Sequence, residues 1–145
     1  MLQTDDFNQP KIVYMEIQTD NPNEGYPFPC FSYDNNRTVV LNTGYIMCSK
    51  EFDVRYILGV LNSSLGGFMS KFYVTQLQER QFRMLAQYVA KFPIPKPSES
   101  ISRQIIDCVV CQINKYSPAI ERLINEHVYN LYGLNDTEIN FIEHE

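Results

Sequence analysis

Apolar and polar residues alternate in the first third of the chain, which is the pattern of short, half-buried strands. Residues 11–17 (KIVYMEI) predict one strand, and residues 31–34 (FSYD) predict a second. Residues 38–49 (TVVLNTGYIMCS) predict one strand or two, broken near Asn42-Thr43-Gly44. The connections are short or rich in proline and glycine, so we expect a small, mostly antiparallel, twisted sheet.

The spacing of the apolar residues becomes helical after residue 52. Asp53 can cap the N-terminus of a helix, whose apolar stripe consists of Tyr56, Ile57, Val60 and Leu61. Residues 62–64 (NSS) interrupt this helix, and a second apolar face follows with Leu65, Phe68, Met69 and Phe72. A Gly66-Gly67 pair costs roughly 1–2 kcal/mol in a helix relative to alanine. We therefore expect a bend there, or the close approach of another segment.

Polar side chains dominate residues 75–83 (TQLQERQFR), which predict a loop or a strand exposed on one face. Residues 84–92 (MLAQYVAKF) fit a helix or a strand. Three prolines follow at positions 93, 95 and 97, and they force the backbone into an extended conformation. This proline segment must end the preceding element sharply.

The remaining residues predict three helices. The first covers residues 98–115, with Ser98 or Ser100 as its N-cap. The second begins with Pro118 in its first turn and ends at Gly133. The third is short and begins at Asn135 or Asp136.

These elements indicate an α+β fold with packed helices and a C-terminal helical tail. We expect residues 1–97 to form a β-rich lobe with one long helix, and residues 98–145 to form a helical tail that packs on it. A chain of 145 residues has the size of one structural domain.

Charge is distributed unevenly, although the net charge of −5 argues weakly against nucleic-acid binding. Residues 1–69 have a net charge of −4, and residues 99–145 have −5. Residues 70–98 have a net charge of +4, because Glu79 alone opposes five basic residues: Lys71, Arg80, Arg83, Lys91 and Lys96. From charge alone, a solvated face is the simpler interpretation of this basic segment.

The cysteines and the N-terminus indicate a reduced, cytoplasmic protein. The N-terminus has no apolar signal segment, and no apolar run is long enough to cross a membrane. Cys108 and Cys111 form a CxxC pair within a predicted helix, but a second CxxC is absent, and His127 and His144 have no ligand spacing. We expect structural, buried cysteines rather than a metal or redox site.

Catalytic motifs are absent from the chain. It contains no GxGxxG, GxxxxGK[ST], HExxH or GxSxG, and no tight pair of acids stands out as general acid and base. It also lacks the Asp/Asn-Pro-Pro-Tyr loop with which adenine-N6 methyltransferases hold a flipped base. We therefore do not expect this chain to be an enzyme by itself.

Several segments, in order, resemble the TaqI-like C-terminal specificity domain, the target-recognition module of adenine-specific DNA methyltransferases and related restriction–modification enzymes. They are KIVYMEI, FSYD with LNTGYIMC, YILGVLNSSLGGFMSKF, KFPIP and INEHVYNLYGLNDTEINFIE. Each motif is weak alone, and their order and spacing over residues 11–143 carry the resemblance.

The resemblance implies a module that binds double-stranded DNA and positions it for an N-terminal methyltransferase domain, to which an endonuclease is fused in some enzymes. This chain has neither domain, so the resemblance implies a C-terminal fragment of a larger enzyme. S-adenosylmethionine would be the cofactor of the methyltransferase domain, and no cofactor is expected in this chain. Residues 1–97 would be the DNA-recognition lobe.

Candidate DNA contacts follow from side-chain chemistry. Arginine can bind guanine and glutamine can bind adenine through paired hydrogen bonds, which suggests base contacts by Gln76, Gln78, Arg80, Gln81 and Arg83. Lysines suit phosphate contacts, and the candidates are Lys71, Lys91 and Lys96.

Alternatives remain for each of these groups. Lys96 could be simply solvated, Arg80 and Arg83 could pair with acids of the tail, and Tyr73 and Phe82 could belong to the core rather than stack on bases. The tail itself could be a spacer or could form weak homodimer contacts. A different function class, a non-enzymatic protein–protein interaction module, would bind through the aromatic sheet and the tail. Only DNA binding should weaken steeply with salt.

Overall fold

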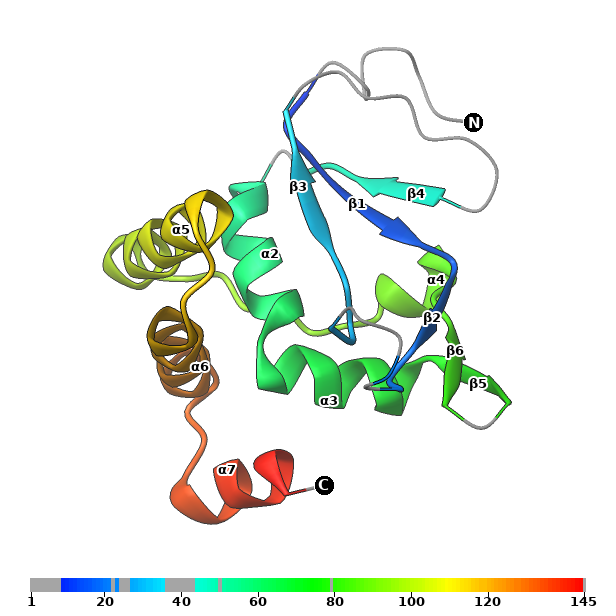
Figure 1. Cartoon of the computed structure of the whole chain (residues 1–145). Helices are drawn as coiled ribbons and strands as arrows, with labels where there is room; N and C mark the ends of the chain where they lie inside the picture. The colour runs from blue at the N-terminus through cyan, green and yellow to red at the C-terminus, as the bar shows by residue number, and fades with distance from the viewer. Residues whose placement is uncertain are drawn as a thin grey trace.

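The computed structural model describes residues 9–21, 23, 27–35, 44–49, 51–78 and 80–144. They form two small antiparallel sheets and six helices, which confirms the predicted α+β fold and the helical tail. Two central helices separate the sheets from the tail, which lies along the opposite side of the molecule (Figure 1).

The first sheet has the strand order β3-β1-β4, with β1 (Lys11–Met15) between β3 (Ser32–Asp34) and β4 (Gly44–Met47). Its inner face carries Ile12 and Tyr14, both buried. The part of the third predicted strand that precedes Gly44 lies outside the described residues.

The prediction of one continuous strand over residues 11–17 is wrong, because the chain changes sheets at Glu16. The next strand, β2 (Ile17–Thr19), pairs with β6 (Gln81–Arg83) in a second sheet of order β2-β6-β5. The Glu16 carbonyl accepts a hydrogen bond from the backbone N–H of Met84, just beyond β6. Distant partners therefore decide where the strand breaks.

Within residues 75–83, where a loop or a single strand was predicted, β5 (Thr75–Gln78) and β6 pair as an antiparallel hairpin. The central residue of β6, Phe82, is buried and its ring lies 4.8 Å from that of Phe28. Its neighbours on β6 point to the other face of the sheet. This hairpin lies beyond the C-terminal end of α3, at the lower right of Figure 1.

Two helices occupy the centre, α2 (Val54–Asn62) and α3 (Ser64–Tyr73). Asp53 caps α2 as predicted, since its Oδ1 accepts a hydrogen bond from Arg55 N at 2.9 Å. Ser63 separates the helices and caps α3 through Gly66 N at 3.1 Å. Asn62 Oδ1 accepts from the backbone N–H of Phe31 at 3.1 Å, and Asn62 Nδ2 donates to the Phe31 carbonyl at 2.8 Å, which connects α2 to the start of β3.

The proline segment is held by two tyrosines. After a short helix, α4 (Ala86–Val89), the chain runs from the side of the sheets toward the tail (Figure 1). The Tyr56 hydroxyl donates to the Pro95 carbonyl at 2.7 Å, and the Tyr132 hydroxyl donates to the Pro93 carbonyl at 2.5 Å. Missing N–H groups prevent a helix here, and the exposed carbonyls become acceptors for the core tyrosines.

The tail consists of α5 (Glu99–Asn114), α6 (Pro118–Tyr132) and α7 (Asp136–Glu143). Their predicted ends are confirmed, with Ser98 and Asn135 as N-caps and Gly133 ending α6 at φ 66°. Within the tail, α5 packs closely on α2, because Gly59 of α2 leaves room for Ile105 and Val109 of α5. No described helix has the length and apolarity of a membrane span.

The prediction of buried cysteines is wrong for Cys111. Both cysteines of the CxxC pair lie on α5, but Cys108 is buried against the core and Cys111 is exposed. The contact between α5 and α2 decides which side of the helix is covered. Within the described part of the chain, no three His, Cys, Asp or Glu side chains are grouped as a metal site requires.

Candidate nucleic-acid interface

The tight end of the β5–β6 hairpin positions Arg80. Gln78 pairs with Gln81, so only two residues connect the strands. Arg80 has a φ of 63°, and this left-handed conformation costs a non-glycine residue roughly 1–2 kcal/mol. Its side chain is 49% exposed, and exposed ion pairs contribute only about 0–1 kcal/mol. The ion pairs of Arg80 therefore at best offset the cost of its backbone conformation.

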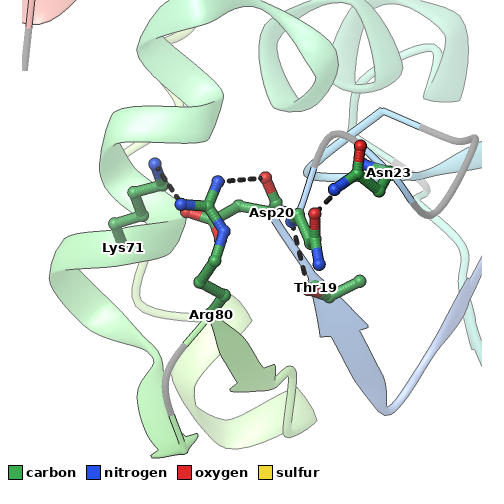
Figure 2. Close-up of polar contacts among 6 residues, drawn as sticks. Thr19, Asp20, Asn23, Lys71 and Arg80 are labelled. Atoms are coloured by element: carbon green, nitrogen blue, oxygen red, sulfur yellow. Dashed lines mark hydrogen bonds and ion pairs between the residues drawn. The ribbon is translucent and has the colours of Figure 1, made fainter.

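Asp20 holds both Arg80 and Lys71 (Figure 2). Lys71 Nζ lies 3.1 Å from Asp20 Oδ2, and Arg80 Nε lies 3.2 Å from Asp20 Oδ1. The contact with Oδ1 is an ion pair without hydrogen-bond geometry, whereas Arg80 Nη2 donates to the Asp20 carbonyl at 2.8 Å. Two cations thus share one carboxylate, which leaves a local excess of positive charge.

A second carboxylate, that of Glu16, holds Arg83. Arg83 Nε lies 3.3 Å from Glu16 Oε2, and the Tyr45 hydroxyl donates to Glu16 Oε1 at 2.7 Å. The hydrogen bond to Glu16 raises the pKa of the Tyr45 hydroxyl, because the ionised phenol could not donate it. This network links β4 of the first sheet to β6 of the second and fixes the direction of the guanidinium.

The two faces of the second sheet differ in character. Phe82 pairs with Gln18, which is also buried and bonds the backbone N–H and carbonyl of Cys30. The opposite face carries Arg83, paired with Ile17, and Gln81, paired with Thr19. Arg83 and Ile17 are exposed, and Gln81 is partly exposed. The sheet therefore presents an accessible face with one arginine and one glutamine, two residues apart.

A comparison with protein families identifies the fold and the function class. Residues 3–94 match the model of the TaqI-like C-terminal specificity domain. The chain belongs to this family. Specificity domains of this family recognise DNA in restriction–modification enzymes, and they are not catalytic. The match ends at Ile94, within the proline segment, so the helical tail follows the matched part.

Some predicted contact residues of this specificity domain come together and others do not. Lys71 and Arg80 meet at Asp20, while Gln81 and Arg83 lie on the accessible face of the second sheet. Gln76 is exposed but pairs with Phe82, and so belongs to the other face. The side chain of Gln78 lies outside the described part.

The other two lysines of the basic segment follow the hairpin in the chain. Lys91 lies over the Tyr88 ring, 5.4 Å from its centroid. Lys96 is exposed and follows Pro95, which is bonded to Tyr56 of α2. The chain leads away from the sheets at this point (Figure 1).

The alternative prediction, that Arg80 and Arg83 pair with acids of the tail, is wrong. Arg80 and Arg83 pair with Asp20 and Glu16, because the hairpin is hydrogen-bonded to β2 and these acids flank that strand. Neither acid was predicted as a partner, because Glu16 lay within the predicted strand 11–17 and Asp20 in the loop that follows it. The net charge of the basic surface is accordingly smaller than the segment alone indicates.

Of two rings assigned to the core or to an apolar helix face, Phe82 and Phe72, only Phe82 is buried. Phe82 is buried, as its assignment to the core required. Phe72 was assigned to the apolar face of α3, but it is 72% exposed. The tail explains this difference, since α7 covers Phe68 through Phe141, at 5.8 Å between rings, and does not cover the last turn of α3.

A groove of about 1470 Å³ lies between the helices and the first sheet. Its wall includes Lys71 and three exposed rings: Phe72 of α3, Phe141 of α7 and Tyr116 of the loop between α5 and α6. The groove therefore adjoins the Asp20 cluster at Lys71.

Proposed function

We propose that this specificity domain recognises the target sequence of an adenine-N6-specific DNA methyltransferase in a restriction–modification system. It would grip the duplex and position it for a separate catalytic domain, which would bind S-adenosylmethionine and accept the flipped adenine. The membership in the TaqI-like family supports the DNA-recognition part of this proposal. The methylation chemistry would depend on the catalytic domain.

One observation carries the proposal: the accessible face of β6 presents Gln81 and Arg83 beside a pair of half-exposed cations. Base contacts specify a sequence, while phosphate contacts position the protein on the duplex. Arg83 is 45% exposed and held by Glu16, which suits bidentate contact with guanine. Gln81 on the same face suits adenine.

Replacement of Arg83 tests the proposal. Duplexes would be selected from a randomised pool, and their binding measured by fluorescence anisotropy at 50–200 mM salt. We expect Arg83→Ala to weaken binding to the selected sequence by about 1–3 kcal/mol and to relax preference at one base position. The matched change Arg103→Ala, of an exposed arginine on α5, should leave both unchanged.

A protein-interaction module is the second candidate, and the aromatic groove is the observation that favours it. An apolar interface should depend little on ionic strength, whereas DNA affinity should fall with a log–log slope of about −0.9 per phosphate contact. Failure of the chain to bind any selected duplex at 50 mM salt would contradict the first proposal and favour the second.

A further inference from the structure

The Asp20 cluster leaves donors directed away from the carboxylate. A guanidinium has a side edge, formed by Nε and Nη2, and an end edge, formed by Nη1 and Nη2. The side edge of Arg80 faces Asp20, through Nε to Oδ1 at 3.2 Å and Nη2 to the carbonyl at 2.8 Å. The end edge remains for a bidentate acceptor, and Lys71 has two further N–H donors beyond its contact with Asp20.

Three distant segments hold this cluster rigidly. Asp20 follows β2, Lys71 lies in the last turn of α3, and Arg80 lies in the β5–β6 turn. The backbone N–H of Asp20 donates to the Arg80 carbonyl at 3.3 Å, which extends the ladder between β2 and β6. Asp20 is only 18% exposed, while the two cations are about half exposed. The carboxylate is therefore the support, and the cations form the accessible surface (Figure 2).

The chemistry of the cluster fits a phosphodiester better than a base edge. Two cations that converge on one carboxylate leave a net positive charge, which a phosphate can neutralise and a neutral base cannot. Lysine binds phosphate as a point charge, and arginine binds it through a bidentate edge. A glycine or asparagine would suit the left-handed turn better than Arg80, so the guanidinium itself is what this position supplies.

We propose that Lys71 and Arg80 clamp one phosphodiester of the DNA backbone, and that Asp20 is the positioning residue that orients both cations. This inference rests on the proposed DNA-recognition function. It moves Arg80 from the base contacts to the backbone contacts and leaves Arg83, three residues later, as the base-contacting arginine. The clamp sets the register of β6 on the duplex.

Replacement of Asp20 should change DNA affinity in the direction opposite to that expected for an ordinary acidic residue. Removal of a negative charge from a DNA-binding surface ordinarily strengthens binding, because repulsion of the phosphates decreases. If Asp20 orients the clamp, Asp20→Asn should instead weaken binding about 5- to 10-fold. The log–log salt slope should also become shallower by about 0.9, because one phosphate contact is lost.

The experiment compares Asp20→Asn with Glu126→Gln, which changes the charge equally on the exposed side of α6. Binding of the full chain to its selected duplex is measured by fluorescence anisotropy at several salt concentrations. Weaker binding and a shallower slope for Asp20→Asn alone support the clamp. Equal or tighter binding by Asp20→Asn overturns it, while the DNA-recognition proposal stands. If the unmodified chain binds no duplex, both proposals are overturned.

Arg80→Gly separates the clamp from folding and from base recognition. Glycine suits a φ of 63°, so this variant should keep the thermal midpoint of the unmodified chain while its DNA affinity falls at least 5-fold. The base preference among selected duplexes should not change. A changed preference at any base position would show that Arg80 contacts a base, and would overturn its assignment to the backbone.

Discussion

Two tyrosine hydroxyls hold the proline segment that follows the sheets. Tyr56 and Tyr132 come from helices far apart in the sequence, yet both donate to carbonyls of the proline segment. The sequence predicts that Tyr56 lies on the apolar stripe of its helix and that the prolines form an extended segment. The bond between them could not be predicted, because a hydroxyl donor has no sequence signal for its acceptor.

Tyr56→Phe should lower the free energy of unfolding by about 1 kcal/mol at pH 7, because the Pro95 carbonyl loses its partner. Burial raises the pKa of Tyr56 to about 12. A raised pKa in the folded state means that this stability is complete below pH 10 and is lost between about pH 10 and 12. Urea unfolding at pH 7 to 11 should therefore show a smaller alkaline decrease for the variant.

Tyr116→Phe is the control for this measurement, because Tyr116 is exposed on the loop between α5 and α6. Its free energy of unfolding at pH 7 should change by less than about 0.5 kcal/mol. Equal effects of the two substitutions would show that the bond to Pro95 does not stabilise the fold.

At the scale of elements, local signals predicted the helices better than the strands. Asp53, Ser98 and Asn135 bond backbone N–H groups within three residues of themselves, so each cap can be read from a short window. Strand ends depend on partners elsewhere in the chain. The break at Glu16 was missed because β1 and β2 pair with different sheets.

The junction of α2 and α3 provides a matched pair of glycines. A Cβ atom on Gly66 would lie 2.1 Å from the Leu61 carbonyl oxygen, whereas one on Gly67 would lie 3.4 Å from Pro29 Cδ. Gly66→Ala should lower the free energy of unfolding by about 2–3 kcal/mol, because backbone must move. Gly67→Ala should raise it by up to about 1 kcal/mol through helix propensity. Urea denaturation would measure both, and equal effects would contradict the close approach at Gly66.

At the scale of the whole molecule, α2 packs against both the first sheet and the helical tail. The first sheet packs on it from one side, and α5 and α6 pack from the other (Figure 1). The tail contributes six buried residues to the core: Ile105, Cys108, Val109, Ile124, Val128 and Tyr129. Burial of this many side chains contributes on the order of 10 kcal/mol, which is comparable with the whole net stability of a domain. We therefore propose that residues 1–97 and 98–145 form one structural domain.

A chain that ends at Pro97 should lose its cooperative thermal transition, because the face of α2 around Gly59 would be exposed. A chain that ends at Leu134 lacks only α7, which has no buried residues, and should retain the transition. Calorimetry or circular dichroism would compare the two. A cooperative transition of the shorter chain near the midpoint of the full chain would show that the tail is a separate unit.

The fold class, the helix caps, the end of α6 at Gly133 and the family could all be predicted from the sequence. The caps and the apolar period depend on residues close together in the chain, and the family depends on the order of short motifs along it. Which cations act together depends instead on the tertiary structure, since Asp20 lies 51 and 60 residues before Lys71 and Arg80. The pairing of β2 with β6 creates this cluster and places Arg83 on an accessible face. Electrostatic partners act through space, so charge counted along the chain could indicate a basic segment but not its geometry.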